Sequence, residues 1–167
     1  KKRCSENNLK LGITPFYIQA VNESIEYLDF FKVASYEVLW KDLHVAIAKK
    51  KLPTIISSGM ATMPELLDIK KTFIENGLSN FELTFLHCES NYPAFYNSAN
   101  LSAISSMRAE LRTEVGWSDH TRDTDVILMA KYRFGCETFE LHFDIDGKGE
   151  EAGVGHCWLP KEIKQLN

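Results

Sequence analysis

Short runs of apolar, β-branched and aromatic residues recur along the chain, and longer segments with helical spacing separate them. Most of the runs are too continuous for a sheet with one wet face, so they predict strands buried on both faces. The predicted strands are Leu11–Phe16, Phe30–Ala34, Thr54–Ser57, Phe81–His87, Thr113–Trp117 and Thr138–Phe143. The predicted helices are Ile18–Asp29, Leu39–Lys51, Met63–Asn76, Leu101–Arg112, Val126–Phe134 and Lys161–Leu166.

This alternation of strands and helices is typical of a parallel sheet with helices outside it. The six β/α units predict one α/β domain over residues 1–167, either doubly wound or part of an eight-stranded barrel. Thr62 and Glu65 form a capping-box pattern at the start of the Met63–Asn76 helix. Since no Gly-rich phosphate loop follows any predicted strand, dinucleotide and P-loop sites lack their fingerprint.

Composition and charge narrow the classes of partner. The chain is 44% hydrophobic and 25% charged, as in ordinary globular proteins, and its net charge of -4 argues against nucleic-acid binding. No apolar run approaches the roughly 18 residues of a membrane helix, so no membrane partner is expected. The cysteines lack a Cys-x-x-Cys pair, which predicts free thiols and a cytoplasmic protein. They are Cys4, Cys88, Cys136 and Cys157.

Polar side chains gather at the predicted carboxyl ends of the strands, where parallel β/α proteins bind ligands. Lys32 lies inside the apolar run Phe30–Ala34, so its ammonium must be desolvated or paired with an anion. We interpret it as part of an anion site. The hydroxyls of Ser35, Ser57 and Ser118 suit a phosphate, although they could instead satisfy backbone groups.

Two histidines follow neighbouring predicted strands and indicate metal binding or acid–base chemistry. His120 and His142 have this position, and Glu140 points to the same strand face as His142. The alternative for each histidine is a purely structural role, as a hydrogen-bonded side chain of the core. His44 is interpreted as structural because it lies in mid-helix, and His87 stays open between core and site.

Six motifs occur in order over residues 11 to 160, and together they resemble the sialic acid synthase family. They are Thr14-Pro15-Phe16, Phe31–Glu37, Ile56–Thr62, Leu86-His87-Cys88 with Tyr92-Pro93, Gly116–Thr121 and Glu140–Phe143. The family fold is a (β/α)₈ TIM barrel of about 250 residues followed by a small antifreeze-like domain. The resemblance therefore implies a single partial barrel carrying strands three to eight, without the N-terminal strands and the antifreeze-like domain, and a homodimer when full length.

The resemblance implies a transferase that condenses phosphoenolpyruvate with N-acetylmannosamine or a related amino sugar, giving a nonulosonic acid and phosphate. It implies a divalent metal, Mn²⁺ or Mg²⁺, held by His120 and His142. The implied catalytic residues are Glu37, Lys32 and Glu140. The implied phosphoenolpyruvate-binding residues are Thr14, Lys32, Ser35, Ser57, Ser90 and Ser118, and the implied pocket residues are Tyr92 and Asp119.

The chain departs from the family most clearly after the last predicted strand. The family commonly has Pro-Gly-Pro-Asp-His there, whereas this chain has Gly155 at the position of the aspartate, followed by His156. Two other classes therefore stay open. One is another metal-dependent barrel aldolase or sugar isomerase, and the other is a non-catalytic relative that binds a sugar or a partner protein.

Overall fold

The computed structural model describes residues 1–166, and it consists of parallel strands that alternate with helices. The chain forms two compact units. The first comprises Lys1–Phe85 with Glu110–Glu114, and the second comprises Leu86–Ala109 with the chain from Val115 onward. The boundary falls inside strand β4, Leu83–Cys88, so each unit contains one end of that strand.

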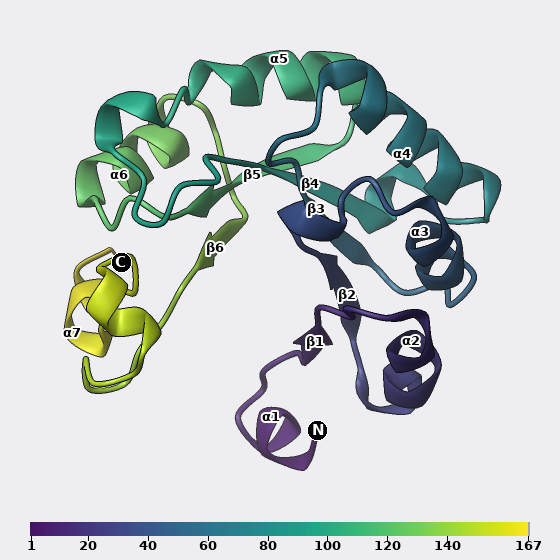
Figure 1. Cartoon of the computed structure of the whole chain (residues 1–167), viewed down its shortest axis with the longest axis horizontal. Helices are drawn as coiled ribbons and strands as arrows, with labels where there is room; N and C mark the ends of the chain where they lie inside the picture. The colour runs from purple at the N-terminus through teal and green to yellow at the C-terminus, as the bar shows by residue number, and fades with distance from the viewer. Residues whose placement is uncertain (167) are drawn as a thin grey trace. The chain divides into compact units, whose positions relative to one another are not determined.

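The first unit carries the strand order β1-β2-β3-β4. Its parallel register pairs Gly12 with Phe30 and Phe31 with Thr54. Figure 1 shows its helices α2, α3 and α4 following one another on one side of these strands. Its elements are α1 (Lys2–Glu6), β1 (Gly12–Ile13), α2 (Ile18–Ser24), β2 (Phe30–Val33), α3 (Lys41–Ala48), β3 (Thr54–Ser57) and α4 (Met63–Glu75), with short 3₁₀ turns at Ile25–Tyr27, Ser35–Glu37 and Asn80–Glu82.

The core of the first unit is formed by alternate strand residues and one face of each helix. Its fully buried apolar side chains include Phe31, Ile56, Leu43, Ile47 and Phe73. The predicted capping box of α4 is confirmed, because Glu65 accepts hydrogen bonds from the backbone and hydroxyl of Thr62.

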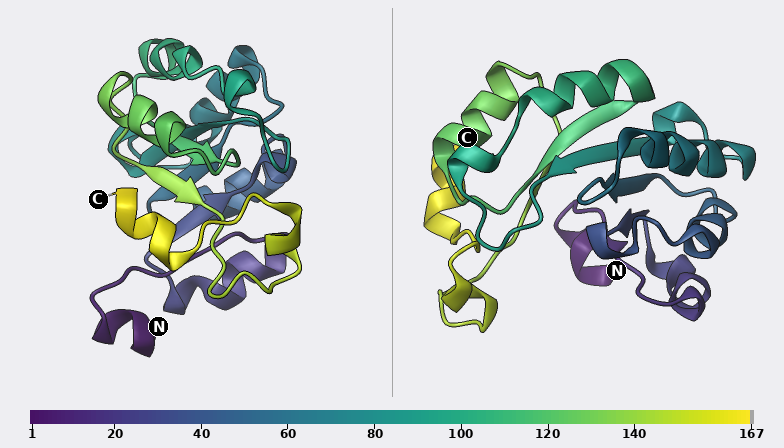
Figure 2. Two further views of the ribbon diagram at one scale, coloured as in Figure 1. Left: turned by 90° about the vertical axis from the view of Figure 1, so that its left-hand side faces the viewer. Right: turned by 45° about the horizontal axis from the view of Figure 1, so that its top comes forward.

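The second unit carries the strand order β4-β5-β6, with Trp117 in register with Phe139. Gly116 allows these strands to approach, because a Cβ there would meet the Thr138 carbonyl oxygen at 2.1 Å. Figure 2 shows a long connection between β6 and α7. The elements are α5 (Ser102–Leu111), β5 (Glu114–Asp119), α6 (Thr124–Tyr132), β6 (Phe139–Leu141) and α7 (Pro160–Ile163), with 3₁₀ turns at Tyr96–Ser98, Glu151–Val154 and Lys164–Leu166.

The six predicted strands and six predicted helices occur in the predicted order, with shifts at their ends, and the structure adds the short helix α1. β1 has two residues rather than six, and β5 continues to Asp119. The second long helix begins at Lys41, which leaves Leu39 outside it and 56% exposed. The four cysteines are free thiols, as predicted. In residues 1–166, no helix has the length and apolar character that crossing a membrane requires.

Candidate functional site

In the first unit, the candidate site centres on a buried lysine. Lys32 lies in β2 and is 8% exposed. Its Nζ donates to Ser57 Oγ at 2.7 Å and to the Val33 carbonyl oxygen at 2.9 Å. The parallel register of β2 and β3 brings these groups together, because Ser57 ends β3. A buried ammonium at the carboxyl ends of parallel strands can bind an anion through charge-assisted hydrogen bonds.

A carboxylate and two hydroxyls lie at the neighbouring strand ends of the same unit. Glu37 ends the turn Ser35–Glu37 after β2, and its Oε2 is buried without a hydrogen-bond partner among the described residues. Ser35 is buried at the start of that turn, and Thr14 directly follows β1. The structure thus places Thr14, Lys32, Ser35, Glu37 and Ser57 at the carboxyl ends of three successive strands.

In the second unit, three histidines surround one tyrosine ring and form an imidazole cluster of His120, His142 and His156. The centroids of His120 and His142 are 5.2 Å apart, and those of His142 and His156 are 4.5 Å apart. The Tyr92 ring lies 4.1 Å from His120 and 5.1 Å from His156. The two predicted metal-binding histidines are therefore neighbours, and a third lies beside them.

The strand register and a returning segment explain the cluster. Ser118 in β5 is opposite Glu140 in β6, so His120 and His142 leave the two strands at the same level. After His142 the chain forms a long loop and comes back to the end of β6 at Trp158. The Trp158 backbone N–H then donates to the His142 carbonyl oxygen at 2.7 Å, beside a parallel bridge between Phe143 and Trp158. This return brings His156 next to His142.

Burial keeps two of these imidazoles neutral. Desolvation lowers the pKa of His120 and that of His156 below the usual histidine value. His120 Nδ1 lies 2.6 Å from the Glu89 carbonyl oxygen, which can only accept, so Nδ1 carries the proton. The lone pair of His120 is consequently on Nε2, which is the state that a metal ion requires.

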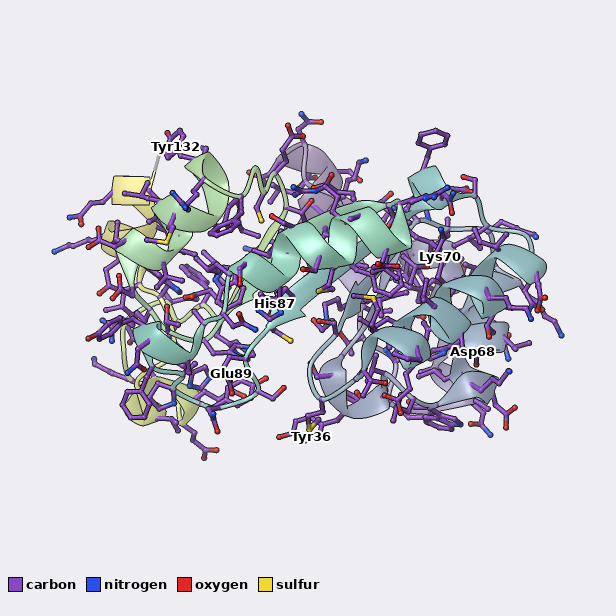
Figure 3. The ribbon with its side chains drawn as sticks, turned by 90° about the horizontal axis from the view of Figure 1, so that it is seen from above. Tyr36, Asp68, Lys70, His87, Glu89 and Tyr132 are labelled. Atoms are coloured by element: carbon purple, nitrogen blue, oxygen red, sulfur yellow. The ribbon has the colours of Figure 1, made fainter. Side chains whose placement is uncertain are left out.

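The other predicted residues of this unit have distinct environments. Ser118 Oγ donates to Glu140 Oε2 at 2.7 Å, so the structure pairs the predicted phosphate contact with a predicted catalytic carboxylate. Ser90 Oγ is buried without a hydrogen-bond partner among residues 1–166. Figure 3 shows Glu89 on the loop after β4 and His87 beneath α5. His87 Nε2 lies 2.9 Å from the Ala99 carbonyl oxygen, and its ring contacts Trp117.

Asp119, a predicted pocket residue, has a fully buried and densely hydrogen-bonded environment. Its side chain is 0% exposed, and its carboxylate accepts from the indole N–H groups of Trp117 and Trp158 at 3.1 and 2.9 Å. It also accepts from Thr121 and from the Arg122 backbone. Because these donors saturate a buried carboxylate, Asp119 holds β5, the following turn and the returning segment together.

Sequence reasoning missed a group of possible metal ligands around His142. His142, Glu151, His156 and Cys157 each offer one ligand atom, and these atoms all lie within 4.8 Å of one another. Glu151 and His156 lie in the divergent segment, where the sequence offers Glu151 only as a substitute for the lost aspartate and gives His156 no role. The sequence signal for the group is the pair His156-Cys157 directly after that position.

Gly155 has a backbone conformation that suits glycine. Its φ is +100°, in the left-handed region, where a side chain is strained even though no atom lies within 4 Å of a Cβ placed there. Gly155 therefore stands at a turn after Glu151–Val154 whose left-handed backbone disfavours an aspartate.

The comparison with protein-family models decides the family. The model of the NeuB family matches residues 1–167, the whole sequence. The chain belongs to the NeuB family. The predicted fold class, α/β of the (β/α)₈ barrel type, is confirmed by the similarity to a solved structure. That structure is a sialic acid synthetase from Leptospira borgpetersenii, with 29% identity, a TM-score of 0.91, and coverage of 99% of this chain and 57% of that one.

Curated relatives of the NeuB family member carry the names of several different acid synthases. An N,N'-diacetyllegionaminic acid synthase from Campylobacter jejuni is 33% identical over 99% of this chain and 48% of its own length. A pseudaminic acid synthase from the same species is 37% identical over 81% of this chain and 40% of its own length. The chain therefore spans about half the length, or less, of these relatives.

Proposed function

We propose that the chain carries part of the active site of a nonulosonic acid synthase, an enzyme that condenses phosphoenolpyruvate with N-acetylmannosamine or a related amino sugar. The single observation that carries the proposal is the buried Lys32–Ser57 pair on β2 and β3 in a NeuB family member. A buried ammonium at a strand end suits a substrate that carries negative charge, as phosphoenolpyruvate does.

Lys32 and the predicted hydroxyl residues are proposed to bind the phosphate. The ammonium would donate charge-assisted hydrogen bonds to phosphate oxygens, with Ser57 completing the contact. Thr14, Ser35 and Ser90 are proposed as further contacts, and the buried unpartnered Oγ of Ser90 supports its part. Ser118 can contribute only if its hydroxyl leaves Glu140, so its assignment is the weakest of the set.

His120 and His142 are proposed to hold a divalent metal, and their residues fit one. The imidazole of His120 is neutral and its Nε2 lone pair is available, while the His142 ring lies 5.2 Å away between centroids. Mn²⁺ or Mg²⁺ bound there would supply Lewis-acid polarisation of the sugar aldehyde. Tyr92, which packs on both rings, would orient them and line the sugar pocket.

The proposed reaction forms a carbon–carbon bond. The enol carbon of phosphoenolpyruvate attacks the aldehyde carbon of the open-chain sugar. Glu37 is proposed to transfer a proton to the resulting alkoxide. Its buried Oε2, without a partner among residues 1–166, supports a proton-transfer role. Water then adds to the phosphate-bearing carbon and phosphate leaves by C–O cleavage. Phosphoenolpyruvate, sugar and water thus give the nonulosonic acid and phosphate.

Phosphate release from phosphoenolpyruvate tests the proposal. The purified protein with Mn²⁺ should release phosphate only when phosphoenolpyruvate and an N-acetylated amino sugar are both present. Mannose, which lacks the acetamido group, is the matched control sugar. An aldolase or isomerase acting on a sugar alone, with no phosphate release in any combination, would contradict the synthase proposal.

A non-catalytic sugar-binding role is the second candidate, and Gly155 is the observation that favours it. The family's acidic residue is absent at this position, and a φ of +100° is a backbone conformation that favours glycine. Binding of phosphoenolpyruvate and metal without phosphate release from any amino sugar would support this candidate. Turnover with even one amino sugar would exclude it.

A further inference from the structure

A group of four potential ligands lies where the chain returns after β6. His142 Nδ1 is 3.3 Å from Glu151 Oε2, and His156 Nε2 is 3.9 Å from the same oxygen. Cys157 completes the group, with its ligand atom within 4.8 Å of the other three. Ligand atoms around one tetrahedral ion at about 2.1–2.3 Å are separated by roughly 3.5 Å, so only small shifts would close this group on a metal.

His156 provides independent support for a ligand at this place. Its side chain is 4% exposed, and its Nδ1 is buried with no hydrogen-bond partner in the described part of the chain. Leaving a buried polar atom without a hydrogen-bond partner is unfavourable and unusual in proteins. A metal ion bound at Nδ1 would occupy the lone pair of this atom.

The donor set selects a kind of metal. Two imidazoles, a carboxylate and a thiolate suit zinc, iron(II) or cobalt(II), whereas Mg²⁺ prefers oxygen ligands. Burial raises the pKa of the Cys157 thiol, so without metal this sulfur is protonated and inert. An ion would displace that proton and bind the thiolate.

We infer that His142, Glu151, His156 and Cys157 form a transition-metal site that is built into this chain by its divergent segment. The inference shares His142 with the proposed metal site and goes beyond it, because it adds Glu151, His156 and Cys157 as ligands and is tested by metal binding alone. In this site the segment after β6 supplies Glu151, His156 and Cys157 as ligands, so the ion bound to His142 would have three further protein ligands, with His120 nearby.

The segment should keep its place when a ligand is substituted. Trp158 donates to the buried Asp119, and Arg122 forms an ion pair with Glu162, 2.5 Å between Nη2 and Oε1. Both contacts bind the returning chain to the turn after β5 without using any of the four ligands. Variants of the ligands are therefore expected to fold, and circular dichroism in the absence of metal checks this.

Cobalt(II) titration of the purified protein tests the thiolate ligand. Thiolate–cobalt bonding produces an intense charge-transfer band in the near ultraviolet, which carboxylate and imidazole ligands do not give. We expect this band in the parent protein, its loss in Cys157→Ser, and its retention in Cys136→Ser, a buried thiol whose Sγ donates to the Val115 carbonyl oxygen. A parent protein without the band would overturn the inference.

Zinc affinity tests the other ligands. Competition with a chromophoric chelator should show at least about a 100-fold weaker affinity in His156→Ala and a marked loss in Glu151→Gln. Glu150→Gln, an exposed neighbour, is the control and should bind as the parent does. Unchanged affinity in both His156→Ala and Cys157→Ser would overturn the site. Because neither titration measures phosphate release, a failure of the synthase proposal would leave these results unaffected.

Discussion

The side chain of Lys32 is buried, and its ammonium is hydrogen-bonded to one hydroxyl and one carbonyl oxygen. Keeping a charge in that position costs free energy, which natural proteins accept mostly at sites that bind an ion of opposite charge. The buried stem of Lys32 is apolar, so removal of the charge can be separated from removal of the side-chain volume.

Lys32→Met is therefore expected to weaken phosphoenolpyruvate binding by at least about tenfold while leaving metal affinity unchanged. Methionine keeps most of the stem and removes the ammonium. Calorimetric titration with phosphoenolpyruvate measures the effect. Lys41→Met is the control, since Lys41 is exposed and forms only a surface ion pair with Asp68. Equal phosphoenolpyruvate affinity in Lys32→Met and the parent would remove Lys32 from the phosphate site.

Gly155→Asp restores the residue type of the family but not its function. Because the φ of Gly155 is +100°, an aspartate there should cost about 1–2 kcal/mol of unfolding free energy. We expect a lower urea midpoint and no gain in phosphate release. Gly153→Asp, at a neighbouring glycine with open space around its Cβ position, is the matched control. A variant that releases phosphate faster than the parent would show that the lost aspartate can be replaced in place.

At the scale of elements, the strands and helices followed from hydrophobic spacing, but their ends did not. Strand β5 runs to Asp119 because that carboxylate is buried by two indole donors, and a sequence window cannot reveal that compensation. Leu39 was assigned to a helix by its spacing from Leu43 and Ile47, although the helix begins at Lys41. Local patterns predict which face is apolar, whereas tertiary hydrogen bonds decide where an element ends.

The residues of the candidate site also differ in whether local sequence patterns predict them. Lys32 and the pair His120 and His142 were predictable, because a charge in an apolar run and imidazoles after neighbouring strands are local signals. His156 was not assigned a role, since only the parallel bridge between Phe143 and Trp158 brings it beside His142. The hydrogen-bond environment of Asp119 could not be predicted, because one indole donor comes from Trp117, two residues earlier, and the other from Trp158, which is distant in sequence.

Asp119→Ala should cost at least about 3 kcal/mol of unfolding free energy, because two indole N–H groups and three further donors lose a buried acceptor. Asp123→Ala is the neighbouring control. Asp123 caps the N-terminus of α6 by accepting from Asp125 and Val126, and its loss should cost about 1 kcal/mol. Urea denaturation compares the two. Equal losses would mean that Asp119 does not join β5 to the returning segment.

At the scale of the whole molecule, burial makes the chain sensitive to acid. Desolvation lowers the pKa values of His44, His87, His120 and His156. Each of these imidazoles is neutral in the folded chain at a pH where the unfolded chain already binds a proton. Stability therefore rises with pH across this range and falls as the solution is acidified.

His44 has the largest expected effect. Burial against Phe73 lowers its pKa from 6.5 to about 4. Its contribution to stability is complete above pH 6.5 and is lost as the pH falls towards 4, by an amount of roughly 3 kcal/mol in total. His44→Gln should flatten the dependence of the unfolding free energy on pH between these values. His87→Gln serves as a comparison with a smaller effect. An unchanged slope in His44→Gln would show that His44 does not titrate on unfolding.

The distribution of the thiols has a practical consequence. Cys4 is partly exposed on α1, whereas Cys88, Cys136 and Cys157 are buried. A maleimide dye should therefore attach to Cys4 first, which provides a single labelling position near the N-terminus without any mutagenesis. The remaining thiols would react only when their surroundings open, so the rates at which they are alkylated would report the local opening of strands β4 and β5 and of the chain around Cys157.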